Sequence, residues 1–298
     1  MPGKLRSWLK HLKTMRNASR MGVFFPSAKS PQPAPGGSVD PPASGWNRLV
    51  EEVSWFRITE HHLHLETFPR HLNILHLTDL HLREESDWLD LLIDQLRGLE
   101  PDLTLITGDL VTRGWTKEAA VKLLKALPKS TLGTYAIMGN WEYWSGASPQ
   151  TWGPFLKEYG IQLLRETWID FGSWCLAGTD DHLAGNSEPE KWLNALSEKP
   201  TIVMTHSPAL FPRLVYPHVG LVLAGHTHGG QVRIPKWGAI WVPRGTGPYV
   251  SGWFKEQNTH LFVSRGLGWS VAPLRFKAPP ELAWISINPP KVSKDDCS

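Results

Sequence analysis

Short apolar runs that end in polar residues recur along the chain, and two stretches of helical periodicity separate the first three. The apolar runs predict strands that lead into polar loops, at residues 72–82, 102–111, 133–140, 201–208 and 219–230. Residues 87–99 and 117–127 carry apolar side chains at the three- and four-residue spacing of an amphipathic helix. Strands that alternate with helices predict βαβ units and parallel strands. In such a sheet, polar residues beyond the carboxyl ends of the strands gather at one edge, where ligands bind.

Side chains with oxygen or nitrogen donors follow all five predicted strands. The donors are Asp79, His81, Asp109, Asn140, His206, His226 and His228. Taken singly, an aspartate after a strand usually caps a turn, and a histidine in an apolar run usually packs in the core. Together, carboxylates, imidazoles and an amide without a thiolate suit Mn²⁺, Fe or Zn²⁺. Seven ligands exceed the need of one ion, whereas two ions roughly 3.5–4 Å apart that share one carboxylate would use them all.

The order of the polar blocks carries a family resemblance. The blocks are DLH, GD, GNWE, THSP and GHTHGGQ, each after a predicted strand. Over roughly residues 46–288 they resemble the calcineurin-like metallophosphoesterases. The resemblance implies an α/β fold with a two-sheet core flanked by helices, an α/β/β/α sandwich, and a metal-dependent hydrolase with two divalent ions, foremost Mn²⁺. It also implies that a water bridging the metals is the nucleophile, and it names no catalytic side chain.

The resemblance further distributes the seven ligands between the two ions. The first ion would take Asp79, His81, Asp109 and His228, and the second Asp109, Asn140, His206 and His226. Asp109 would then bridge the two ions, because a carboxylate has two oxygens. Glycines 229 and 230 would let the backbone turn sharply beside two of the ligands, where a Cβ would clash.

One position departs from the family pattern. In most members the residue after the metal-binding asparagine is a histidine that protonates or hydrogen-bonds the leaving group, and here it is Trp141. Indole cannot act as an acid, and acid catalysis, typically worth about 10²–10⁴-fold, matters most for a basic leaving oxygen. Trp141 therefore favours a substrate with a good leaving group, such as a pyrophosphate, over alkyl phosphomonoesters or nucleic acids. The alternative is that catalysis has been lost and the chain is a metal-bound, non-catalytic binding module.

The C-terminal third narrows the substrate hypothesis through a second resemblance. Residues 229–254 and 260–287 are similar to a bacterial subgroup of membrane-associated phosphohydrolases that includes a UDP-2,3-diacylglucosamine pyrophosphatase of the lipid A pathway. That activity is the leading hypothesis, and a broad-specificity phosphodiesterase or phosphatase is the alternative. Trp141, Arg244 and Arg265 are the expected substrate-binding residues, because arginine binds phosphate through paired hydrogen bonds. Ordinary ion pairs explain the two arginines equally well.

Charge is unevenly distributed along the chain. The net charge is +3, but residues 1–25 contain Lys4, Arg6, Lys10, Lys13, Arg16 and Arg20 and no acid. The remaining chain is slightly acidic, which argues against a nucleic-acid partner. Apolar residues at helical spacing in this basic segment predict an amphipathic helix that could bind an anionic membrane, although an unstructured tail or a transit peptide fits too. We expect this segment at residues 1–26, a Pro/Gly/Ser-rich linker at 27–45, and one metallophosphoesterase domain at 46–298.

The cysteines and the lack of long apolar runs bear on localisation. Cys175 and Cys297 form neither a disulfide framework nor a metal motif, which fits a reducing compartment. No run reaches about eighteen apolar residues, and no apolar signal-peptide core is present. We expect a cytoplasmic protein, peripheral at the inner membrane.

Two further polar groups lie outside the blocks. His61, His62 and His64 are expected on the exposed face of a strand, and Asp180–His182 in a loop with side-chain caps.

Overall fold

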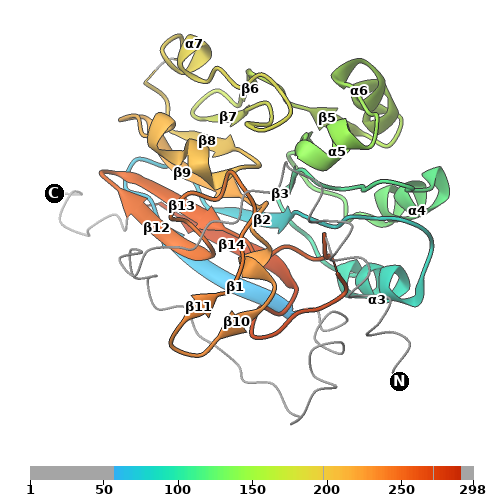
Figure 1. Ribbon diagram of the computed structural model, residues 1–298. Coiled ribbons are helices and arrows are strands. Elements are labelled where there is room, and N and C mark those ends of the chain that lie inside the picture. The colour runs from blue at the N-terminus through green and yellow to red at the C-terminus, as the bar shows by residue number, and fades with distance from the viewer. Residues whose placement is uncertain (1–56, 197, 271, 290–298) are drawn as a thin grey trace, which may run out of the picture.

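The computed structural model describes residues 57–196, 198–270 and 272–289. The basic segment at residues 1–26 and the linker at 27–45 lie outside this range, so both remain predictions. Two six-stranded sheets and a separate two-stranded sheet form the framework (Figure 1). In the part of the chain that is described, no helix is both long and apolar enough to cross a bilayer.

The first sheet contains the first three predicted strands. Its order is β1 (Arg57–His64), β14 (Glu281–Asn288), β2 (Leu72–Leu77), β3 (Leu103–Thr107), β4 (Thr134–Ile137) and β5 (Ile161–Leu163). Strands β2 to β5 are parallel, as the alternation with helices predicts. The last strand of the chain, β14, enters between β1 and β2 and runs antiparallel to β2.

The second sheet contains the two remaining predicted strands. Its order is β12 (Gly252–Glu256), β13 (Thr259–Val263), β9 (Val219–Ala224), β8 (Thr201–Met204), β7 (Cys175–Gly178) and β6 (Thr167–Asp170). The four central strands are parallel, and the two edge strands are antiparallel to their neighbours. The third sheet is the hairpin of β10 (Arg233–Ile234) and β11 (Gly238–Ala239).

The core consists of layers, because alternate residues of each central strand point to opposite faces. In β8 and β9, Ile202 and Leu221 pack between the two sheets with residues of the first sheet, while Val203 and Val222 pack on the outer face. Both faces are covered, so the central strands are continuous apolar runs. The α/β/β/α sandwich expected from the family resemblance is therefore confirmed.

Helices cover the outer faces of the sheets. On the first sheet lie α3 (Asp87–Leu96), α4 (Lys117–Ala126) and α6 (Pro149–Lys157), whose apolar sides share one cluster with β2 and β3. On the second sheet lie α7 (Glu190–Leu193) and the 3₁₀ helix η2 (Pro208–Arg213). Side-chain caps fix where α3 and α4 begin, since Ser86 accepts a hydrogen bond from the amide of Leu89 and Thr116 from that of Ala119. Two short helices, α5 (Asn140–Trp144) and η3 (His228–Gly230), follow β4 and β9 directly.

The three histidines of β1, expected on the exposed face of a strand, are only partly exposed as predicted. His62 and His64 are exposed, as predicted. His61 is partly buried, because its face of β1 packs against the second sheet, where Trp253 donates a hydrogen bond to its Nδ1 at 3.1 Å. The role of His61 is structural, and the expectation of full exposure is wrong for this residue.

Candidate metal centre

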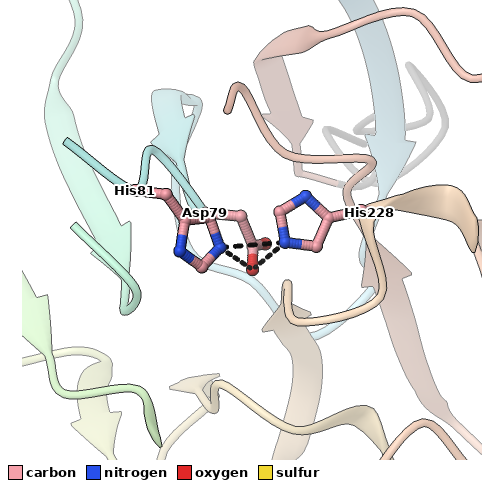
Figure 2. A group of neighbouring side chains, drawn as sticks. All are labelled: Asp79, His81 and His228. Carbon is pink, nitrogen blue, oxygen red and sulfur yellow. Dashed lines mark hydrogen bonds and ion pairs between the residues drawn. The ribbon is translucent and has the colours of Figure 1, made fainter. Parts of the chain in front are cut away.

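The loops after β2 and β9 bring three of the predicted ligands together from distant parts of the chain. The Nε2 atoms of His81 and His228 are 2.9 Å apart, and His228 Nε2 is 3.5 Å from Asp79 Oδ1. Donor atoms of all three side chains lie within 4.8 Å of one another, and all three are buried (Figure 2). We call these residues the first cluster.

The loops after β3, β8 and β9 form a second cluster, made of Asp109, His206 and His226. His206 Nε2 lies 3.1 Å from Asp109 Oδ2 and 3.1 Å from His226 Nδ1. Here too the donor atoms lie within 4.8 Å of one another and are buried. The edge where the two sheets present their strand ends therefore contains two candidate ion sites.

Asp109 is positioned to serve both clusters. Its Oδ2 faces His206 at 3.1 Å and His81 of the first cluster at 3.6 Å. Its Oδ1 accepts a hydrogen bond from the backbone amide of Trp141 at 2.8 Å. A carboxylate between two sets of imidazoles is the geometry that a shared ligand requires.

Asn140, the seventh predicted ligand, is the first residue of α5 and is buried. Its Oδ1 has no hydrogen-bond partner among the described residues. A buried amide oxygen without a partner is uncommon and calls for an explanation, such as an ion. The preceding residue, Gly139, is packed against the second cluster, since a Cβ there would lie 2.3 Å from Asp109 Oδ1 and 2.9 Å from His206 Cε1. Asn140 therefore lies beside the second cluster.

Outer hydrogen bonds select which imidazole nitrogens face the second site. His206 Nδ1 lies 2.7 Å from the carbonyl oxygen of Thr107, and His226 Nε2 contacts the carbonyl oxygen of Arg244. A carbonyl can only accept, so each of these nitrogens carries the proton. The opposite nitrogens, His206 Nε2 and His226 Nδ1, face Asp109 and each other, so these are the nitrogens that would bind an ion. Although burial opposes its charge, the nearby carboxylates, Asp109 foremost, raise the pKa of His206, so this ring carries a second proton that an ion would displace.

The electrostatics of the clusters also suit cations. Burial lowers the pKa of His81 to about 4 and that of His226 to about 3, so both stay neutral, which is the ligating form. Burial raises the pKa of Asp79 to about 7. Burial also opposes the charge of Asp109, but the facing imidazoles, chiefly His206, outweigh it and lower the pKa of Asp109. Positive charge is thus favoured beside buried carboxylates, and divalent ions would supply it.

The backbone at the centre is held in a conformation that L-residues rarely adopt. Five of the predicted ligands have positive φ values between 48° and 71°, namely Asp79, His81, Asp109, His226 and His228. Such residues cost roughly 1–3 kcal/mol each and concentrate at functional sites. The surrounding packing must offset the cost of these conformations. The packing is tight at this point, since a Cβ on Gly225 would lie 2.4 Å from Asp79 Oδ2.

Glu142 is a supporting residue to which sequence reasoning assigned no role. Its buried carboxylate accepts hydrogen bonds from the backbone amides of Gly139, Asp109, Leu110 and Val111, at 2.6–3.2 Å. Burial, followed by the charge of Asp109, raises its pKa to about 8. Glu142 thus ties the loop after β3 to the start of α5. The spacing of Gly139 and Glu142 is that of a helix capping box and could have revealed this role.

Trp141 forms part of the wall around the first cluster. Its ring is perpendicular to that of His81, with 5.6 Å between centroids, and it contacts Trp144 edge-to-face at 5.4 Å. Arg83 was not anticipated from the sequence. Its guanidinium lies 4.3 Å from the ring centroid of Trp269, and its charge acts on His81.

The two arginines predicted to bind substrate are placed differently. Arg244 has an exposed side chain, and its carbonyl oxygen contacts His226. Arg265 forms an ion pair with Glu281 at 3.1 Å, which is the structural alternative anticipated for it. Its role in substrate binding stays a prediction.

The Asp180–His182 segment forms a loop closed by its own side chains. Asp181 Oδ2 accepts the amides of Leu183 and Ala184 at 2.8 Å and 2.6 Å. Asp180 accepts the hydroxyl of Tyr143 at 2.5 Å and is paired with Arg165. The loop is therefore capped as expected and also braces α5 from outside.

A two-sheet sandwich with paired carboxylate and imidazole clusters at its edge defines a metal-dependent hydrolase with a dinuclear centre. Residues 72–230 match the family of calcineurin-like phosphoesterases, and the chain belongs to this family.

Relatives support the assignment along most of the chain. An uncharacterized metallophosphoesterase of Helicobacter pylori is 33% identical over 82% of this chain and 67% of its own length. The metallophosphoesterase YkuE of Bacillus subtilis is 30% identical over 82% of this chain and 89% of its own. The phosphodiesterase YaeI of Escherichia coli is 31% identical over 79% of this chain and 90% of its own.

Proposed function

We propose that this hydrolase cleaves a phosphoanhydride or an activated phosphodiester, with UDP-2,3-diacylglucosamine as the leading substrate candidate and Mn²⁺ as the leading metal. The observation that carries the proposal is Trp141, which stands where the family has a histidine. Two divalent ions held by the predicted ligands would supply Lewis acidity at the phosphoryl group and an activated water. A weakly basic leaving group needs no proton in the transition state, so the loss of the imidazole costs such a reaction little.

The described residues suggest how the chain itself contributes. Glu142 holds the amide of Asp109, and the amide of Trp141 orients the Asp109 carboxylate, so the shared ligand keeps its position without help from substrate. The rings of Trp141 and Trp144 offer an aromatic surface against which the uracil or sugar of a nucleotide-linked substrate can pack. Arg83, which is exposed and lies two residues after His81, supplies a cation for the phosphates of the substrate.

The second candidate is a phosphodiesterase of broad specificity. It is favoured by the relative YaeI, whose name is phosphodiesterase and which spans 79% of this chain. The two candidates differ in the leaving groups that they tolerate, so one set of assays separates them.

The test is to incubate purified protein and Mn²⁺ with UDP-2,3-diacylglucosamine, an alkyl phosphodiester, bis-p-nitrophenyl phosphate and p-nitrophenyl phosphate in parallel. We expect the pyrophosphate to be the best substrate. Trp141→His should change its cleavage little and raise cleavage of an alkyl phosphodiester by up to about 10²-fold, because an imidazole can protonate an alkoxide. Trp168→His is the matched control, because it replaces an exposed tryptophan on the edge strand β6 and should leave the ratio of the two rates unchanged.

Two results would reject the proposal. Wild-type protein that prefers alkyl esters, with a ratio that Trp141→His does not change, would show that the leaving-group argument is wrong. Absence of turnover on every ester while both ions are bound would favour the non-catalytic binding module.

The proposal includes a peripheral position at the cytoplasmic face of the inner membrane through residues 1–25. Each basic residue near an anionic surface contributes about 1 kcal/mol, and salt weakens this attraction. Liposome flotation should decrease when the segment is deleted. Equal flotation of the full-length and truncated proteins would contradict this part of the proposal.

A further inference from the structure

The hairpin of β10 and β11 exposes three large apolar side chains close together. Trp237 is 86% exposed, and Ile234 and Ile240 are each 45% exposed. The other exposed large apolar residues of the described chain lie singly on other elements, namely Ile58, Leu91, Trp144, Trp168 and Leu183. Single exposed residues need no explanation, whereas a group of three on one hairpin suggests a contact surface. Figure 1 shows the hairpin in the lower part of the view, below β1, as a small sheet of its own.

The turn of this hairpin is well defined. The amide of Trp237 donates to the carbonyl oxygen of Ile234 at 3.1 Å, with Pro235 and Lys236 between them. Proline at the second position and a positive φ of 70° at Lys236 are the features of a type II turn. Lys236 adopts this conformation although it is not glycine, so the turn is held in place by its surroundings.

The base of the hairpin is anchored to the metal centre. Arg233 Nη1 donates to the carbonyl oxygen of Gly229 at 3.0 Å, and a Cβ on Gly230 would lie 2.3 Å from that of Ala239. Gly229 and Gly230 directly follow His228 of the first cluster. Whatever the tip binds is therefore held at a fixed position relative to the two clusters.

The hairpin and the segments that flank it in the sequence carry charge of one sign. Residues 229–255 contain no aspartate or glutamate, and their basic residues are Arg233, Lys236, Arg244 and Lys255. Tryptophan beside lysine is the composition that occurs where protein meets the polar region of a bilayer. A protein interface buries roughly 800 Å² per partner, which is large for the three exposed apolar side chains of one narrow hairpin. Insertion into a lipid boundary has no such requirement.

We propose that the β10–β11 hairpin is a membrane-docking tip, which inserts Trp237, Ile234 and Ile240 among the headgroups of a bilayer containing anionic lipid. Lys236, in the turn of the hairpin, adds electrostatic attraction to the lipid phosphates. The contact is separate from residues 1–25 and requires no particular substrate. It places the metal centre next to the bilayer, so that a phosphate group at the membrane surface is within reach of the clusters.

A local probe separates this contact from any binding by the N-terminal segment. Full-length protein with Cys297→Ser and Lys236→Cys receives an environment-sensitive nitrobenzoxadiazole label, because the remaining Cys175 is buried. The control carries the label at Lys157→Cys, on α6, which lies far from the hairpin in Figure 1. Vesicles contain phosphatidylcholine and phosphatidylglycerol at about 7:3, with or without a lipid that carries an acyl-chain nitroxide.

With vesicles, emission from the label at position 236 should rise about twofold or more and be quenched by the nitroxide, because the tip enters the lipid boundary. The label at position 157 should respond to neither. Emission at position 236 that ignores vesicles and nitroxide would overturn the proposal and would leave the hairpin as a site for a protein partner.

The second measurement uses unlabelled full-length protein. The triple variant Ile234→Ser, Trp237→Ser and Ile240→Ser should bind anionic vesicles about tenfold more weakly than wild type, while Trp168→Ser should bind as wild type does. Equal binding by the triple variant and the wild type would also overturn the proposal. Metal content and thermal unfolding of each variant check that the fold is retained. Neither the fluorescence nor the vesicle-binding measurement depends on hydrolytic activity.

Discussion

The two clusters contain the same kinds of ligand but differ in what holds their imidazoles. In the second cluster, His206 and His226 each direct one ring nitrogen at a backbone carbonyl oxygen. In the first cluster, His81 Nδ1 has no hydrogen-bond partner among the described residues. His228 Nδ1 lies 3.4 Å from a guanidinium nitrogen of Arg275.

The difference concerns which nitrogen carries the proton. A carbonyl accepts, so it fixes the proton on the outer nitrogen and leaves the inner one ready to bind metal. A guanidinium donates, so the contact with Arg275 favours a proton on His228 Nε2, the nitrogen that faces Asp79 and His81. An ion at either cluster displaces a proton, because the carboxylates around His206 raise its pKa although burial opposes its charge. Only in the second cluster, however, do carbonyl oxygens then hold both rings in the ligating tautomer. We therefore expect the second cluster to bind metal more tightly.

The largest effect should come from Asp109, whose carboxylate faces imidazoles of both clusters. Asp109→Asn should reduce the metal content of reconstituted protein below two ions per chain and lower kcat/KM by more than about 100-fold, because even outer-shell ligand partners are worth 10–100-fold. Metal analysis and a phosphodiesterase assay measure both effects. Asp87→Asn, at an exposed position on α3, is the control. Two ions retained by Asp109→Asn would show that no carboxylate is shared.

A smaller effect should follow from filling the space between Gly139 and the second cluster. Gly139→Ala places a Cβ 2.3 Å from Asp109 Oδ1, and such overpacking costs about 1–3 kcal/mol of unfolding free energy. Gly153→Ala is the matched control, because its Cβ would meet Leu163 at 3.5 Å, an ordinary contact. Urea unfolding of wild type and both variants measures this loss of unfolding free energy. If Gly139→Ala is as stable as wild type, the loop after β4 relaxes freely.

Acid stability tests the support of the first cluster. Glu281 pairs with Arg265, next to Gly266, where a Cβ would lie 2.6 Å from that of Asp79. Although burial opposes its charge, the pairing with Arg265 lowers the pKa of Glu281 from 4.5 to about 2. A carboxyl group with a lowered pKa stabilises the fold above its ordinary pKa, and this contribution is lost as the pH falls from 4.5 towards 2.

Glu281→Gln removes that dependence on pH. Between pH 6 and pH 3, wild-type protein should lose about 2 kcal/mol more unfolding free energy than the variant does. Urea unfolding at several pH values measures the difference, with the exposed Glu100→Gln as the control. Parallel pH curves for wild type and Glu281→Gln would show that the ion pair contributes nothing.

The smallest effect is the difference in affinity between the two clusters themselves. Titration of the two-ion protein with a chelator should release the ions in two steps, about tenfold apart, in line with the value of outer hydrogen bonds to metal ligands. His81→Ala should lack the weaker step, and His226→Ala the tighter one. If His226→Ala lacks the weaker step instead, the proposed order of affinity is reversed.

Much of the centre follows from local sequence. Apolar runs followed by polar residues predict the strands and the positions just beyond them, because burial and backbone geometry act over a few residues. The seven predicted ligands all lie at such positions, and the structure brings six of them into the two clusters, with Asn140 beside the second. The replacement of the family's histidine by Trp141 is equally visible in the sequence, because the GNWE block alone identifies the position.

Tertiary structure decided the features that depend on residues far apart in the chain. The predicted strands divide between two sheets, and β14 returns to pair with β2 more than 200 residues earlier. The apposition of His81 with His228, the four amides held by Glu142 and the pairing of Arg265 with Glu281 depend on that topology. The sequence shows which side chains can bind a metal, but it does not show which nitrogen of each imidazole faces inward. That choice depends on the acceptor or donor that packing places behind the ring, a carbonyl oxygen in one cluster and a guanidinium in the other.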